Sequence, residues 1–195
     1  MIIQAGGDYG FKVISHRMTD GWVAVARHAS TGFTRTYEQV MKVGDGVGHH
    51  GNRGVLGAHF HDAITGSDQT VLVGHYMTGA HKFRVNREIN RDYARAIGRE
   101  ARKFGVGRRL VFYVGDQNMV DERTDTFFGE PLTSTWDELK KWEGTGHGNI
   151  DVIASYDHDR RVSALYTRAL SDKEFRLHTD HYLVEAGFLI NVKEK

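Results

Sequence analysis

Residues Leu110–Asn118 read LVFYVGDQN, and the rest of the sequence is best interpreted outward from this stretch. Its first five residues are all apolar, which predicts a central strand buried on both faces of a sheet. Gly115, Asp116 and Asn118 follow where that strand ends. A Gly-Asp-x-Asn sequence by itself is typical of a turn. At the end of a central strand, however, a carboxylate and an amide can together hold a water molecule and a phosphate oxygen.

Three further polar signals stand where a predicted strand begins or ends. Gly74-His75 closes the run TVLV, Asn149-Ile150-Asp151 opens the run IDVIASY, and Thr179-Asp180-His181 leads into YLVEAGFLI. Each signal alone is weak, because a histidine at a strand end is most often a surface residue. Their order along the chain carries more information than any one of them.

Short apolar runs bounded by Gly, Asp and Asn predict strands along most of the chain. The predicted strands are Phe11–Ser15, Trp22–Arg27, Val55–Phe60, Thr70–Tyr76, Leu110–Val114, Ile150–Tyr156, Val162–Thr167 and Tyr182–Val192. One long helix is predicted over Asn86–Phe104. A second helix is predicted to start at Thr135, because Thr135 and Glu138 have the spacing of a capping box. These elements predict a mixed fold with more strand than helix.

Six arginines fall on one side of the long predicted helix, counting one that stands just before its start. They are Arg84, Arg87, Arg91, Arg95, Arg99 and Arg102. Such a stripe suggests nucleic-acid binding. Glu88, Asp92 and Glu100 stand three or four residues from arginines, however, so we favour a solvated face of ion pairs.

Composition excludes several classes of protein. The chain has 195 residues, which predicts a single domain over 1–195, and its 26 basic residues nearly balance its 25 acidic ones. Cysteine is absent, which excludes disulfides, thiolate zinc sites and a cysteine nucleophile. No run of about 18 apolar residues and no signal peptide is recognisable. We therefore expect a cytoplasmic protein without a membrane partner.

In this order the four signals resemble those of the endonuclease/exonuclease/phosphatase superfamily. In that family a strand ending in His precedes a helix, a strand ending Gly-Asp-Phe-Asn, an Ile-Asp strand and a final Ser-Asp-His. Here the corresponding segments read GHY, VGDQN, NID and TDHYLVEAGF, and the resemblance covers residues 52–190. It implies the deoxyribonuclease-I-like α/β fold, a two-sheet, mostly antiparallel sandwich flanked by helices.

The resemblance also implies an activity, which is metal-dependent cleavage of phosphodiesters, most readily by a nuclease. Asp116 would orient or deprotonate the attacking water, and Asn118 would bind the phosphate or steady a metal-bound oxygen. His181, paired with Asp151, would stabilise the pentacovalent phosphorus, and His75 would contact the phosphate from the other side. Oxygen ligands of this kind suit Mg²⁺ or Mn²⁺, and nucleic acid is the implied partner.

The metal site departs from the family pattern. Ala5 follows Ile2-Ile3-Gln4 where the family has a metal-binding glutamate, and the chain begins after the strand that carries an active-site asparagine. Asp180 and Asp151 would then hold the cation, with Asp8 as a substitute if its loop bends back. We expect weaker activity with Mg²⁺ than with Mn²⁺. Another subunit or an upstream segment would complete the missing edge strand.

Two rival hypotheses and one variant of the main one stay open. His49, His50, His59, His61 and His75 are candidate ligands for Zn²⁺ or Ni²⁺. A non-enzymatic scaffold or inhibitor domain is the second rival. The variant is a catalytically impaired family member that binds nucleic acid or protein. The cation that raises the melting temperature would separate these hypotheses.

Overall fold

The structure, a computed structural model, describes residues 11–17, 22–28, 33–43, 53–62, 66–76, 84–105, 109–118, 132–139, 151–156, 159, 161–171 and 181–191, with backbone alone in the first three ranges. Its strands are β1 (Phe11–Arg17), β2 (Trp22–His28), β3 (Phe33–Val43), β4 (Arg53–Asp62), β5 (Ser67–His75), β6 (Leu110–Asp116), β7 (Thr133–Ser134), β8 (Asp151–Tyr156), β9 (Val162–Leu170) and β10 (Leu183–Ile190). Its helices are α2 (Arg84–Phe104) and α4 (Thr135–Glu138).

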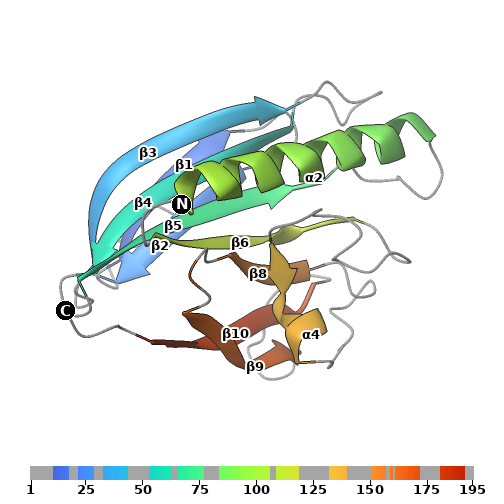
Figure 1. Cartoon of the computed structure of the whole chain (residues 1–195). Helices are drawn as coiled ribbons and strands as arrows, with labels where there is room; N and C mark the ends of the chain where they lie inside the picture. The colour runs from blue at the N-terminus through green and yellow to red at the C-terminus, as the bar shows by residue number, and fades with distance from the viewer. Residues whose placement is uncertain are drawn as a thin grey trace.

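A six-stranded sheet with the order β3-β4-β5-β6-β8-β7 forms the centre of the molecule (Figure 1). Neighbouring strands are antiparallel except β5 and β6, which are parallel and are connected through α2. Parallel neighbours need a crossover connection, and α2 supplies it. Both β5 and β6 therefore end at the same edge of the sheet, where their terminal residues His75 and Asp116 are paired.

The two faces of this sheet are covered by different elements. Helix α2 covers one face, where Tyr93 and Ile97 pack in one cluster with Leu72 and Val111 from the sheet. The hairpins β1-β2 and β9-β10 contact the sheet as well. Phe112, which alternates with Val111 along β6, packs against Phe188 of β10 at 4.9 Å between ring centroids. Period-two alternation in the strands thus divides the apolar residues between the two layers.

The predicted two-sheet α/β sandwich is confirmed. The run LVFYV lies in β6, and the run IDVIASY, from Asp151 onward, forms β8. Both are interior strands of the sheet. Burial of β6 on both faces is incomplete, because Val114, next to the polar end of the strand, is 37% exposed. No described helix is long and apolar enough to cross a membrane.

Strand β3 was not predicted from the sequence, and the residue that caps helix α4 was predicted wrongly. β3 is an edge strand whose pairing with β4 shifts register between Arg35 and Tyr37, which breaks the period of two in its sequence. The predicted capping box at Thr135 is wrong: the N–H of Trp136 bonds to the Ser134 hydroxyl instead. Glu138 accepts the backbone N–H of Ala164 and so joins α4 to β9.

Candidate active site

Three polar side chains occupy one row across the sheet where β5 and β6 end and β8 begins. His75 is the register partner of Asp116 on β6, and Asp116 is the register partner of Asp151 on β8. Register partners in a sheet direct their side chains to the same face. Strand pairing alone therefore places side by side residues that are 41 and 35 positions apart in the sequence.

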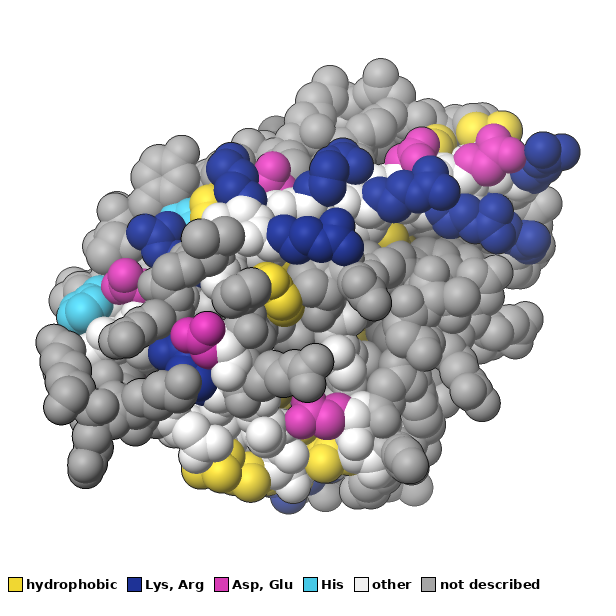
Figure 2. Space-filling view, in the orientation of Figure 1, with side chains coloured by type: hydrophobic (Ala, Val, Ile, Leu, Met, Phe, Trp, Pro, Cys, Tyr) yellow, Lys and Arg dark blue, Asp and Glu magenta, His cyan; other side chains and the backbone are white. Residues whose placement is uncertain are grey.

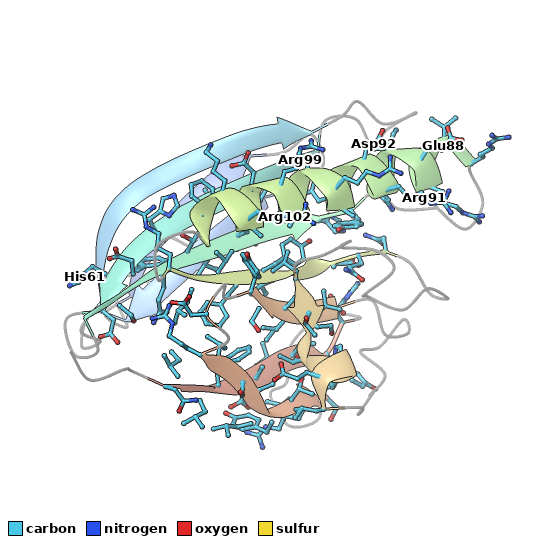
Figure 3. All side chains as sticks on the ribbon, in the orientation of Figure 1. His61, Glu88, Arg91, Asp92, Arg99 and Arg102 are labelled. Atoms are coloured by element: carbon cyan, nitrogen blue, oxygen red, sulfur yellow. The ribbon has the colours of Figure 1, made fainter. Side chains whose placement is uncertain are left out.

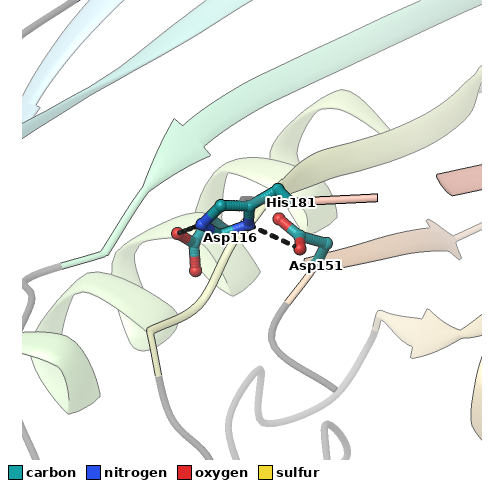
Figure 4. A group of neighbouring side chains, drawn as sticks. All are labelled: Asp116, Asp151 and His181. Atoms are coloured by element: carbon teal, nitrogen blue, oxygen red, sulfur yellow. Dashed lines mark hydrogen bonds and ion pairs between the residues drawn. The ribbon is translucent and has the colours of Figure 1, made fainter. Parts of the chain in front are cut away.

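His181 stands between the two carboxylates of this row (Figure 4). Its Nδ1 lies 2.8 Å from Asp151 Oδ2, and its Nε2 lies 3.9 Å from Asp116 Oδ2. The imidazole side chain is 30% exposed, and both carboxylates are less exposed than it is. The first distance is a hydrogen bond, whereas the second is too long for one.

His75 approaches Asp116 from the other side. Its Nε2 lies 3.2 Å from Asp116 Oδ2 and 2.8 Å from Asn118 Nδ2. Asn118 Nδ2 also donates to the carbonyl oxygen of Tyr76 at 3.1 Å, and a carbonyl oxygen can only accept. The amide is therefore oriented with its nitrogen toward His75, and Oδ1 remains as an acceptor for a water molecule or a cation.

The turn after β6 fixes the position of Asp116. The backbone N–H of Asn118 donates to Asp116 Oδ1 at 2.6 Å, and Asn118 has φ +50°. Asparagine tolerates this left-handed region better than most residues, and an aspartate two residues earlier is a common acceptor in such turns. One carboxylate oxygen is thus held by the turn, and Oδ2 faces the two imidazoles.

Glycines make room beneath the row. A Cβ on Gly115 would lie 2.0 Å from the carbonyl oxygen of Gly74, and a Cβ on Gly74 would lie 2.4 Å from Tyr93 Oη. Tyr76, Tyr93 and Tyr113 fill the helix side here, with 4.7 Å between the ring centroids of Tyr76 and Tyr93. We call these three side chains the phenol layer.

Burial raises the pKa of Tyr113 well above its usual value, and the other two phenols and both carboxylates of the row raise it further. Burial likewise raises the pKa of Tyr76. The two phenols therefore stay neutral at ordinary pH. The phenol layer supports the row without adding charge to it.

Asp116, Asp151 and His181 offer ligand atoms that lie within 4.8 Å of one another. This is the one such group of three that the described residues contain. Two carboxylates and an imidazole suit a divalent cation that accepts both oxygen and nitrogen ligands. The donor set therefore fits a divalent cation such as the predicted Mg²⁺ or Mn²⁺.

Solved structures with the same architecture come from several organisms. An endonuclease/exonuclease/phosphatase from Bacteroides vulgatus matches with a TM-score of 0.78 and 17% identity, over 97% of this chain and 79% of that one. The chain has the endonuclease/exonuclease/phosphatase fold. Within this fold, D. rerio TDP2 complexed with a single-strand DNA product matches with a TM-score of 0.75 and 14% identity, over 95% and 80% of the two chains.

The human Nocturnin catalytic domain with bound sulfate also shares the endonuclease/exonuclease/phosphatase fold. It matches with a TM-score of 0.74 and 13% identity, over 98% of this chain and 76% of that one. No family model matches the sequence, and no curated protein does. The likeness to known proteins is therefore one of fold.

The structure brings together all five side chains that the sequence named as catalytic. They are His75, Asp116, Asn118, Asp151 and His181. The candidate ligands Asp180 and Asp8, together with Ala5, lie outside the described residues. Sequence reasoning missed the phenol layer. It also missed the bond from Asn118 to the Tyr76 carbonyl, which nothing in the GDQN pattern indicates.

The alternative histidine site does not assemble in the described part of the chain. His59 is buried and bonds through Nδ1 to the Thr70 hydroxyl at 2.8 Å, and its ring packs edge-to-face on Phe104. His61 Nδ1 pairs with Asp68 at 2.9 Å. Both lie at the end of β5 opposite His75, and His49 and His50 lie outside the described residues. Neither His59 nor His61 belongs to a described three-ligand group.

Proposed function

We propose that the protein is a divalent-metal-dependent phosphodiesterase, and most readily a nuclease. One observation carries this proposal: the imidazole of His181 lies between Asp151 and Asp116, and His75 lies on the other side of Asp116. Two imidazoles around one carboxylate place proton donors and acceptors on both sides of a point where a phosphoryl group can bind.

Asp151 sets the role of His181. Because Asp151 Oδ2 accepts the Nδ1 proton, His181 is held in one tautomer with Nε2 directed toward Asp116. When Nε2 is protonated, it donates a hydrogen bond to a phosphoryl oxygen, and Asp151 stabilises the imidazolium. This bond strengthens as negative charge builds up on that oxygen during hydrolysis.

Asp116 acts on the attacking water. Its Oδ1 is held by the N–H of Asn118, so Oδ2 faces the gap of 3.9 Å to His181 Nε2. That distance is too long for a direct hydrogen bond, and an oxygen atom beside the line that joins the two groups can contact both of them. Asp116 Oδ2 accepts a proton from a water molecule placed there.

His75 and Asn118 form the other half of the site. In the observed geometry Asn118 is a positioning residue, because both hydrogens of its amide are used by His75 and the Tyr76 carbonyl. His75 then presents its ring to the phosphate. The resemblance implied that Asn118 binds the phosphate or steadies a metal-bound oxygen. Only its Oδ1 is left for a ligand, and this acceptor suits a cation or a water molecule rather than an anionic phosphate oxygen.

Asp116 and Asp151 would hold the cation, and we propose Asp180, adjacent to His181 in the sequence, as a further ligand. A bound Mg²⁺ or Mn²⁺ would neutralise charge on the phosphoryl oxygens and lower the pKa of a coordinated water. The superfamily fold hosts several phosphate chemistries, since one matched structure is a mannosyl-6-phosphatase from Bacteroides thetaiotaomicron. We favour nucleic acid because the matched TDP2 structure holds a DNA product.

The test is cleavage of a supercoiled plasmid and a labelled oligonucleotide in Mn²⁺, in Mg²⁺ and in EDTA. We expect cleavage with Mn²⁺, slower cleavage with Mg²⁺ and none in EDTA or in the Asp116→Asn variant. Binding of the oligonucleotide without cleavage in any metal would replace the enzyme by the impaired binding module. Release of phosphate from a sugar phosphate, with intact nucleic acid, would replace the substrate.

A further inference from the structure

Helix α2 carries more basic than acidic side chains. Its 21 residues include seven basic side chains and three acidic ones. In Figure 2 the dark-blue side chains form a band along the exposed side of this helix, and Figure 3 labels Arg91, Arg99 and Arg102 on it. At 100° per residue the six arginines fall within an arc of about 120°, opposite the buried face.

Ion pairs on the helix account for part of this charge. Arg84 pairs with Glu88 at 2.9 Å, Arg95 with Asp92 at 3.1 Å and Lys103 with Glu100 at 3.5 Å. These three pairs use all the acidic residues of α2. The predicted solvated face of ion pairs is therefore confirmed for Arg84 and Arg95, and Lys103 adds a pair that was not predicted.

Arg87, Arg91 and Arg99 are different. None of the three has an ion pair or a hydrogen bond within the described part of the chain. They lie in one row, separated by four and then eight residues, with the paired Arg95 between the last two. We call Arg87, Arg91 and Arg99 the unpaired row.

The start of α2 also breaks a rule of helix stability. The N-terminus of a helix carries partial positive charge and favours acidic side chains in its first turn. The first turn of α2 contains no acidic residue and instead holds Arg84 and Arg87. Glu88 compensates Arg84, whereas Arg87 has no described partner, and a local rule broken without such a contact is typical of a functional site.

We propose that the unpaired row binds the phosphodiester backbone of a nucleic acid. With a rise of 1.5 Å per residue, Arg87 and Arg99 are about 18 Å apart along the axis, which faces roughly five phosphates of one duplex strand. Arginine suits this ligand better than lysine because its planar fork donates two parallel hydrogen bonds to a phosphate.

The position of α2 agrees with this ligand. The helix runs from the end of β5, where the site row lies, back to the start of β6 (Figure 1). The unpaired row therefore lies on the helix that connects the two strands whose ends carry His75 and Asp116. The unpaired row would hold the nucleic acid at a distance from the bond that is cleaved. This proposal shares with the proposed function only the class of ligand, which is a nucleic acid.

The test measures binding of a labelled DNA duplex in EDTA, where hydrolysis cannot contribute. The variant Arg87→Gln/Arg91→Gln/Arg99→Gln removes the unpaired row. The matched control Arg84→Gln/Arg95→Gln/Lys103→Gln removes the same charge from the same helix, at the paired positions. We expect the first variant to bind at least about tenfold more weakly at low salt, and its salt dependence to fall by about 2 to 3 in log–log slope.

The control should lose clearly less affinity and slope. Equal losses in both variants would show that net charge alone matters and would overturn the proposal, as would unchanged binding in the first. Circular dichroism checks folding, and the single variant Arg91→Gln, expected to lower the slope by about 0.9, serves if the triple variant does not fold. Tighter binding of the native protein to phosphatidylserine vesicles than to DNA, lost in the first variant, would assign the row to a membrane surface instead.

Discussion

The same kind of histidine–aspartate pair occurs at both ends of the central sheet, and the two pairs differ in everything around them. At one end His181 bonds to Asp151 at 2.8 Å, and at the other His61 bonds to Asp68 at 2.9 Å. The side chains of the first pair are 30% and 18% exposed, whereas those of the second are 44% and 50% exposed. A hydrogen bond between a histidine and a carboxylate is therefore not enough to indicate an active site.

The two pairs differ in which other polar side chains lie close to them. Asp116 lies 3.9 Å from His181 and connects it to His75 and Asn118, so four strand ends contribute to one cluster. Asp68 is approached by Arg109 at 4.0 Å, which offers a cation and no further proton acceptor. We call these regions the site end and the far end, and the predictions below compare them.

The carboxylates of the two pairs give the largest expected difference. Asp151→Asn removes the acceptor that fixes the His181 tautomer, so we expect cleavage to fall by about 10²- to 10⁴-fold. Asp68→Asn changes the same atoms at the far end and should leave the rate unchanged. A comparable loss in both variants would mean that the substitution acts through stability.

Glycine shows how closely the site end is packed. Gly115→Ala would place a Cβ 2.0 Å from the Gly74 carbonyl, which only backbone movement can relieve. We expect a loss of about 1 to 3 kcal/mol in the free energy of unfolding, measured by denaturant titration. The control is Gly66→Asn at the far end, where φ is +65° and no atom lies near; it should cost less than about 0.5 kcal/mol.

Asn118 should have a smaller effect on the rate. Removing its amide in Asn118→Ala leaves His75 without the donor that positions it, and we expect about a tenfold loss of activity, a usual size for one hydrogen bond. If Asn118 acts through His75, the double variant with His75→Ala is no slower than His75→Ala alone. Multiplied losses in the double variant would assign Asn118 an independent contact with substrate.

The smallest effect concerns the buried far-end histidine. Burial lowers the pKa of His59, and the charge of Arg109 lowers it further. The unfolded chain therefore binds a proton below about pH 6.5 that the folded chain resists, and stability falls as the solution is acidified. We expect His59→Gln to reduce this fall in melting temperature between neutral and mildly acidic pH. His61→Gln is the control, and an unchanged fall in His59→Gln would contradict the assignment.

Much of the fold could be predicted because its central strands are locally distinct. LVFYV and IDVIASY are apolar runs with clear ends, and their polar end residues are the ones that meet in the candidate site. β3 could not be predicted in this way, since its polar, bulged sequence FTRTYEQVMKV forms a strand only by pairing with β4. Edge strands depend on the partner more than on their own pattern.

The limits of sequence reasoning at the site are also physical. The convergence of His75, Asp116 and Asp151 follows from strand register, which the order of the four signals indicated but could not measure. His59 and His61 were candidate metal ligands in the sequence, and only the structure shows that they bond to Thr70 and Asp68. Which arginines of α2 find acidic partners was likewise a question of side-chain geometry.

The most direct test of the central claim compares His181→Ala with His61→Ala. Both remove the imidazole of a histidine–aspartate pair, one at the site end and one at the far end. The rate of oligonucleotide cleavage in Mn²⁺ is measured for the two variants and the native chain. We predict a loss of at least about a hundredfold for His181→Ala and the native rate for His61→Ala. Native activity in His181→Ala would contradict the assignment of this cluster as the active site.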